Sequence, residues 1–274
     1  MTSAASEVPR SASDKEWPAV AFIGQTTAVA DIELRKLFRD PTELLTRAVQ
    51  PVLWLLVFGE VFTRVRAIPT GTLSYLEFMT PGVLAQSVLF SAIFYGIAII
   101  WERDLGIVHK LLVSPAPRSA LVLGKALSAG FRGLSQTIII YLVALLLGVR
   151  LRSDPAAVLS VCLIVVLGSA LFSSFSLVIA CLVKTRERFM GIGQVLTMPL
   201  FFASNAIYPI TLMPGWLQRI AYANPLTYLV DALRELMIVG GHSVYGLEKD
   251  VLVLSVVFLA LIALAARLFP TIVR

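Results

Sequence analysis

Charged residues and histidines are scarce in this sequence. Only 15% of its 274 residues are Asp, Glu, Lys or Arg, 58% are hydrophobic, and the mean hydropathy is +0.85. A soluble domain has about 25% charged residues, so this chain lacks the charge to cover a water-facing surface. We therefore interpret it as an integral membrane protein. The two histidines, His109 and His242, are isolated, and we expect no metal site.

The two cysteines exclude a disulfide within one chain. Cys162 and Cys181 fall in one apolar run, and a helix would separate them by about 28 Å. That distance is too long for a disulfide, so we interpret both as packing residues.

Motifs for bound nucleotides and for hydrolysis are also absent. The sequence contains no G-x-x-x-x-G-K-[ST], no H-E-x-x-H and no G-x-S-x-G. Its apolar runs carry almost no ionisable groups, whereas ion-driven carriers usually place such groups at mid-membrane. The chain is not expected to be an enzyme, and energy for any transport would have to come from a partner.

The formal net charge is +6. Nucleic-acid binding would require a basic stripe with interleaved aromatic residues, which the sequence lacks, so we expect no nucleic-acid partner. Lysines and arginines on cytoplasmic membrane loops explain the charge better.

The apolar runs predict an all-α membrane protein with six transmembrane helices, since a bilayer-crossing helix needs about 20 apolar residues. The predicted spans are residues 44–62, 79–101, 130–149, 157–183, 189–209 and 251–269. We expect residues 1–21 to be a disordered tail without a cleavable signal, and residues 22–274 to form one six-span membrane domain.

Charge asymmetry predicts the orientation of the six spans. Placing both termini on one side puts sixteen of the 23 lysines and arginines there and seven on the other. The positive-inside rule then predicts that both termini are cytoplasmic. Segments 102–125 and 184–188 would also be cytoplasmic, and residues 210–248 would lie outside.

Residues 22–40 predict an amphipathic helix on the inner membrane surface. Asp31, Arg35 and Arg39 line its polar side, with Asp31 and Arg35 spaced for an i,i+4 pair. A solvated linker helix is the alternative.

Residues 210–241 predict a re-entrant segment in the outer leaflet. Its first part is rich in helix breakers, and Asn224 followed by Pro225 is a typical helix start. The helix that follows carries Asp231 and Arg234 on its polar side. About 14 helical residues reach only about 21 Å, too short to cross a bilayer.

Two motifs in this arrangement resemble those of the membrane subunits of type-2 ABC exporters. Residues 101–125 read WERDLGIVHKLLVSPAPRSALVLGK, similar to the family pattern E-R-x-x-G-x-x-x-x-L-x-x-x-P. Residues 224–236 read NPLTYLVDALREL, similar to the family pattern in which N-P and an arginine are separated by eight residues. Their places in a six-span chain strengthen the resemblance, which runs from about residue 22 to 269. The Gln50-Pro51 opening of the first run looks most like the daunorubicin-type drug-resistance permeases.

The resemblance implies that the segment from Glu102 to Pro115 is a cytoplasmic coupling helix that fits a groove of a separate ATPase subunit. An ordinary charged loop is the alternative. The residues expected to form this coupling site are Glu102, Arg103, Asp104, Gly106, His109, Lys110 and Pro115.

The family also implies a homodimer with two ATPase subunits, which would bind Mg-ATP; no cofactor is expected on this chain. Substrate would pass between the two permease copies along the second and fifth spans. The residues expected to line that path are Phe90, Phe94, Tyr95, Gln194, Met198, Phe201, Phe202 and Asn205. These side chains could instead pack against neighbours or lipid.

Three functions remain open at this point. The first is a permease that exports a lipophilic drug or metabolite across a bacterial cytoplasmic membrane. The second is an exporter of lipid or lipid-linked polysaccharide, and the third is an autonomous channel or secondary carrier. The scarcity of mid-membrane charge argues against the third.

Overall fold

The computed structural model describes residues 41–65, 68–106, 118–183 and 185–269, together with Gly24, Thr26, Thr27, Asp31 and Arg35. The described chain is helical and contains no strand beyond one antiparallel bridge between Leu151 and Ile238. Its elements are α2 (Pro41–Leu53), the π-helical turn η1 (Trp54–Gly59), α3 (Glu60–Val65), α4 (Tyr75–Asp104), α6 (Arg118–Leu146), α7 (Pro155–Leu182), α8 (Arg186–Phe202), the short 3-10 turn η2 (Ile210–Leu212), α9 (Gly215–Ala223), α10 (Pro225–Met237) and α11 (Leu247–Leu268).

Four helices are long and apolar enough to cross a membrane: α4, α6, α7 and α11, with α6 counted from Ala120. α4 contains the run predicted at 79–101, and α7 and α11 match the runs at 157–183 and 251–269 to within four residues. α6 overlaps the run at 130–149 but begins twelve residues earlier and ends three residues earlier. The prediction of an all-helical membrane protein is therefore confirmed.

The first and fifth predicted spans take less regular forms. Residues 41–65 are helical throughout but divide into α2, η1 and α3, and Pro51 lies inside α2. Proline removes a helical hydrogen bond, and the wider π turn begins three residues later. α8 has 17 residues and ends at Phe202, shortly after Pro199. The six-span count therefore stays a prediction.

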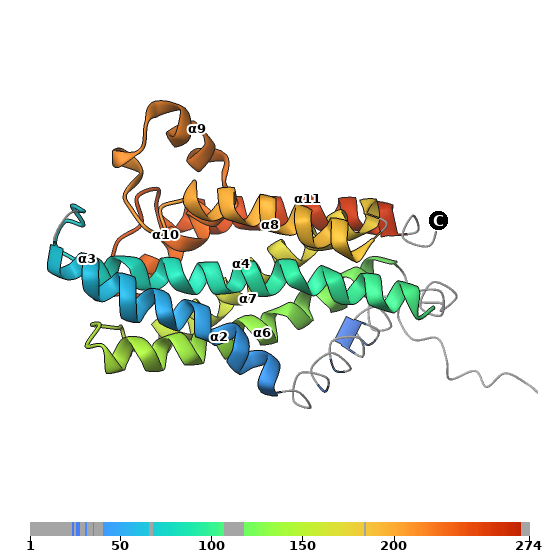
Figure 1. The fold of residues 1–274 in the computed structure, drawn as a ribbon, viewed down its shortest axis with the longest axis horizontal. Coiled ribbons are helices and arrows are strands. Elements are labelled where there is room, and N and C mark those ends of the chain that lie inside the picture. Colours follow the sequence, from blue (N-terminus) through green and yellow to red (C-terminus); the bar gives the residue numbers. More distant parts are fainter. Residues whose placement is uncertain are drawn as a thin grey trace, which may run out of the picture.

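α7 occupies the middle of the bundle and packs against α4, α6, α10 and α11. In Figure 1 the long helices run side by side, and α9 stands away from them at one end. Small residues bring the helices together: Gly96 on α4 leaves space for Ser176 of α7, whose hydroxyl donates to the carbonyl of Ile93. Small residues at helix contacts are typical of membrane bundles.

Local sequence sets several helix starts. Ser74 and Glu77 form a reciprocal capping box at α4, Asp154 caps α7 before Pro155, and Thr185 caps α8. These polar caps satisfy backbone N–H groups that a helix start leaves unpaired.

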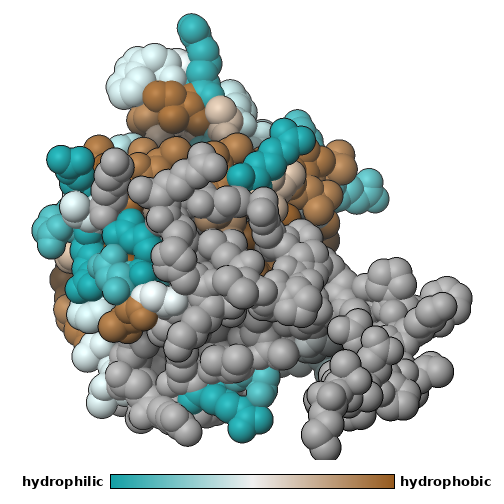
Figure 2. Space-filling view, turned by 90° about the vertical axis from the view of Figure 1, so that its right-hand side faces the viewer, coloured by the Kyte–Doolittle hydropathy of each residue, from teal (hydrophilic) through white to brown (hydrophobic). Residues whose placement is uncertain are grey.

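Large apolar side chains lie exposed along the outer faces of the candidate spans. Examples on three helices are Ile138, Leu142, Leu145, Leu159, Leu163, Val256 and Leu259. Figure 2 views the end at which α4 and α11 finish, and hydrophobic residues reach the surface there beside hydrophilic ones. The exposed apolar faces of these helices suit a hydrocarbon solvent.

Candidate functional site

Polar side chains gather at the two ends of the bundle. We call the end that carries Asp104, Arg186 and Leu268 the inner end, and the end that carries Tyr75, Pro155 and Leu247 the outer end, following the predicted topology.

At the inner end, Asp104 joins the end of α4 to the start of α8. Its carboxylate accepts hydrogen bonds from Arg103 at 2.9 Å and from Arg186 at 2.9 Å. The Arg186 guanidinium also lies 3.6 Å from the ring centre of Trp101, a cation–π geometry. Gly106, with a φ of 71°, follows directly. Asp104 therefore links the end of α4 to the start of α8.

Glu102 differs from the expectation that it faces an ATPase. Its carboxylate is buried and accepts a hydrogen bond from Lys125 of α6 at 2.6 Å. The reason is that α4 continues through Asp104, and two residues of helix turn the side chain by about 200°. Glu102 thus points toward α6, whereas Asp104 points toward α8. Its inclusion among the polar groups exposed to a partner is corrected, and a role in coupling stays a prediction.

The remaining predicted coupling residues divide between two groups. Arg103 and Gly106 lie at the end of α4, and Arg103 also donates to the carbonyl of Val183 at 3.4 Å. His109, Lys110 and Pro115 lie outside the described residues.

The expected polar pair of the amino-terminal segment is present. Arg35 donates to Asp31 at 2.8 Å, and both are helical and exposed. Arg39 lies outside the described residues, so the interface helix as a whole stays a prediction.

At the outer end, Asn224 connects the end of α8 to the start of α10. Its side-chain oxygen accepts from the N–H of Leu226, so it caps α10 as the sequence predicts, with Pro225 as the first helical residue. Its amide nitrogen donates to the carbonyls of Leu200 and Ala203 at 2.6 and 2.9 Å.

Arg234 is a buried cation at the outer end. It donates to the carbonyl of Asn205 at 2.7 Å and to Asp231 at 3.4 Å, and its guanidinium lies 4.0 Å from the ring centre of Phe78. Burial lowers the pKa of Arg234 to about 10, partly offset by Asp231, so the group stays charged at neutral pH.

Asp231 holds the loop between α10 and α11. One carboxylate oxygen accepts from Asn205 at 3.0 Å, and the other accepts from the backbone N–H groups of Val244 and Tyr245 at 2.7 and 3.3 Å and lies 3.0 Å from the Ser243 hydroxyl. Asp231 and Arg234 therefore tie α4, the chain after α8, α10 and the following loop into one polar cluster, which we call the outer lock.

The residues predicted to line a substrate path do not share one environment. Gln194, Met198 and Phe202 are exposed on α8, spaced four residues apart, and Phe90 and Phe94 are partly exposed on α4. Because four residues make slightly more than one turn, the three α8 side chains form a stripe along that helix.

The other three predicted path residues are buried inside the chain. Tyr95 lies under the guanidinium of Arg132 at 4.5 Å, and Phe201 packs edge-on against Trp54 at 5.9 Å. Asn205 belongs to the outer lock. Their assignment to a path stays a prediction, and within one chain they contact protein.

Sequence reasoning missed several polar partners. Arg150 donates to Glu77 at 2.7 Å, and this hydrogen bond raises the pKa of Arg150 above its ordinary value. The S-x-x-E pattern of Ser74 and Glu77 marked that helix start, but nothing in the spacing pointed to an arginine 73 residues away. Lys125 and Arg186 were missed for the same reason.

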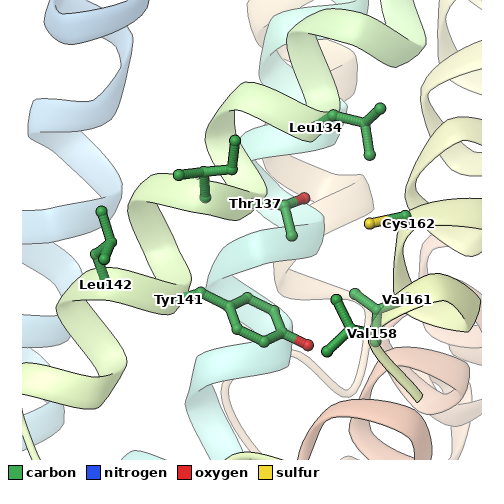
Figure 3. Close-up of a pocket in the computed structure, with 8 residues that line it drawn as sticks. Leu134, Thr137, Tyr141, Leu142, Val158, Val161 and Cys162 are labelled. Carbon is green, nitrogen blue, oxygen red and sulfur yellow. The ribbon is translucent and has the colours of Figure 1, made fainter. Parts of the chain in front are cut away.

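A groove of about 390 Å³ runs between α6 and α7. Figure 3 shows Leu134, Thr137 and Tyr141 on the side of α6 that faces Val158, Val161 and Cys162 on α7. Apart from the hydroxyls of Thr137 and Tyr141 and the thiol of Cys162, the side chains that line the groove are hydrocarbon. It lies apart from both polar clusters.

These features define a class of protein: a polytopic helical membrane protein whose apolar helices are tied by polar clusters at both ends. The chain belongs to the ABC-2 type transporter family, whose model matches residues 24–238.

Three relatives place the chain among transport permeases. The ycf38 protein of Cyanophora paradoxa, named as a transport permease, is 30% identical over 73% of this chain and 69% of its own length. The daunorubicin resistance ABC transporter permease DrrB1 of Streptomyces coeruleorubidus is 28% identical over 79% of this chain and 74% of its own. The inner membrane transport permease YadH of Escherichia coli K12 is 25% identical over 76% of this chain and 81% of its own length. The chain is therefore the membrane subunit of an ABC transporter.

Proposed function

We propose that this chain is the permease of an ATP-driven exporter that moves a lipophilic drug or metabolite out of the cytoplasm of a bacterium. Two copies would form the translocation path and would work with two ABC ATPase subunits that bind Mg-ATP. The proposal includes six spans, both termini in the cytoplasm, an amino-terminal interface helix and the outer re-entrant segment 210–241.

The observation that carries the choice of substrate class is the exposed stripe of Gln194, Met198 and Phe202 on α8. Methionine and aromatic side chains adapt to bulky apolar molecules, and a single amide supplies one polar contact. The name of the DrrB1 relative supports a drug among such molecules.

Alternating access would begin where α4 ends. ATP binding would draw the two ATPase subunits together and move the segment after Gly106. The contact between Asp104 and Arg186 would carry that movement to α8, and the path between the two copies would open outward.

The proposal is tested with the ATPase that co-purifies with the chain. The complex is reconstituted in inverted vesicles, and daunorubicin uptake is followed by its fluorescence. We expect uptake that needs ATP and disappears when the P-loop lysine of the ATPase is replaced. Met198→Trp should reduce uptake severalfold, whereas Leu259→Trp, on the exposed face of α11, should leave it unchanged.

Two results would contradict the proposal. Transport of a lipid-linked sugar, with no uptake of daunorubicin or related compounds, would favour the glycan exporter. Saturable ATP hydrolysis by the highly purified permease alone would refute the division of labour between two subunits.

A further inference from the structure

The groove between α6 and α7 opens toward the lipid-facing surface. At its mouth, the side chains of Ile138 and Leu142 are 63% and 56% exposed. Leu145 and Leu159 continue the same exposed apolar surface. Because the chain is a membrane protein, lipid chains are the molecules that meet this opening.

One hydroxyl in the groove lacks a partner. The Tyr141 hydroxyl is buried and makes no hydrogen bond within the described part of the chain, whereas the Thr137 hydroxyl donates to the carbonyl of Gly133 at 2.9 Å. In Figure 3 the Tyr141 ring reaches from α6 toward Val158 and Val161 on α7. Leaving such a group unpaired in an apolar site costs free energy, so a ligand with a hydrogen-bond acceptor would be favoured here.

The depth of Tyr141 indicates which acceptor it meets. The predicted span 157–183 begins one residue before Val158, so Val158 on α7 lies at the outer edge of the hydrocarbon, and Val161 lies about 5 Å deeper. Figure 3 shows the Tyr141 ring beside these two residues. The Tyr141 hydroxyl therefore lies close to the edge of the hydrocarbon, where the ester carbonyls of glycerolipids begin and where tyrosine is typically enriched.

We propose that the groove binds one acyl chain of an outer-leaflet glycerophospholipid, and that the Tyr141 hydroxyl donates a hydrogen bond to its ester carbonyl. This is a lipid site separate from the translocation path, because none of the residues proposed for that path lines the groove. It depends on the predicted topology only for the choice of leaflet, and it needs no ATPase partner.

The test uses the full chain in vesicles of phosphatidylcholine and phosphatidylglycerol with a trace of phosphatidylcholine carrying a diazirine in one acyl chain. After illumination, mass spectrometry maps the cross-links. We expect them to concentrate on α6 and α7 around Tyr141 and Cys162. Tyr141→Phe, which removes only the hydroxyl, should reduce cross-linking at the groove at least threefold.

Two tryptophan variants separate the groove from general lipid contact. Val158→Trp fills the mouth and should abolish the groove cross-links, while Leu259→Trp on α11 should preserve them. Equal cross-linking in the wild type, Tyr141→Phe and Val158→Trp would mean that ordinary surrounding lipid is being captured, and it would overturn the proposal.

The native cysteines give an independent readout. A lipophilic maleimide should modify Cys162 in detergent and spare the buried Cys181, and added phospholipid should slow the reaction at Cys162 severalfold. Protection by daunorubicin without protection by phospholipid would assign the groove to the exported compound and refute a lipid site. Neither outcome changes the test of export above.

Discussion

Removing the buried cation of the outer lock should destabilise the protein more than any surface charge change. Arg234→Met keeps much of the volume but loses the hydrogen bond to the carbonyl of Asn205 and the contact with the Phe78 ring. It also leaves the buried carboxylate of Asp231 without its cationic partner. Breaking a buried pair on one side typically costs about 3–5 kcal/mol.

The other contacts of Asp231 place the expected value at the lower end of that range. Its carboxylate still accepts from Asn205 and from the N–H groups of Val244 and Tyr245, and these hydrogen bonds limit the cost of losing the arginine. We therefore expect the free energy of unfolding to fall by about 3 kcal/mol. Adding Asp231→Asn should restore about 1 kcal/mol or more, because close partners couple by about 0.5–3 kcal/mol.

The assay is equilibrium unfolding of the purified protein in mixed micelles, followed by tryptophan fluorescence. Arg219→Met on α9 is the matched control, since Arg219 is exposed and surface changes usually stay within about 0.5 kcal/mol. Equal losses for Arg234→Met and Arg219→Met would refute the reasoning. A double variant less stable than Arg234→Met would show that the two side chains do not act as a pair.

Three further predictions follow from the described contacts. In a background without the native cysteines, an impermeant maleimide added to intact cells should label Val244→Cys and spare Leu105→Cys. Both positions are exposed in the structure, so the reverse labelling pattern would overturn the predicted topology. Asp104→Arg and Arg186→Asp should each lower the ratio of export to ATP hydrolysis in vesicles. The double variant, in which the two charges are exchanged, should restore that ratio. The effect on folding should be small, because a half-exposed pair stabilises a protein by at most about 1 kcal/mol. No recovery in the exchanged variant would contradict transmission through this contact. Gly82→Ala should reduce stability by about 1–3 kcal/mol, because the added methyl group would meet the backbone after α8; unchanged unfolding would exclude that close packing.

Hydropathy predicted the long spans because this signal is local. The run at 157–183 corresponds to α7, Pro155–Leu182, where Asp154 and Pro155 mark the start directly. The end of α8 was not predictable in this way. Residues 203–209 are still mostly apolar, and hydropathy does not distinguish an apolar helix from apolar irregular chain that neighbouring protein covers.

The polar clusters could be predicted only in part, because their partners are distant in sequence. Asn224, Asp231 and Arg234 were recognisable from one motif, yet the acceptor of Arg234 is the carbonyl of Asn205, which no motif marks. Glu102 looked like an exposed charge beside Asp104, and only the packing of α4 against α6 reveals Lys125 as its partner. Spacing along a helix fixes which face a side chain takes, but the neighbour on that face is set by the tertiary fold.

The position of α4 between the two clusters gives the proposed transport cycle a physical route. α4 is buried over most of its length. At the inner end, Asp104 joins α4 to Arg186 of α8. At the outer end, Arg234 reaches the carbonyl of Phe78 on α4 and that of Asn205, three residues after α8 ends. Between these ties, Gln194 and Met198 are exposed. In the proposed cycle, a displacement at the inner end would shift α8 along α4 or strain the outer lock, since packed helices tend to move as units rather than bending continuously. The residues at the two ends of α8 would then control the stripe proposed to meet substrate, without touching the substrate themselves.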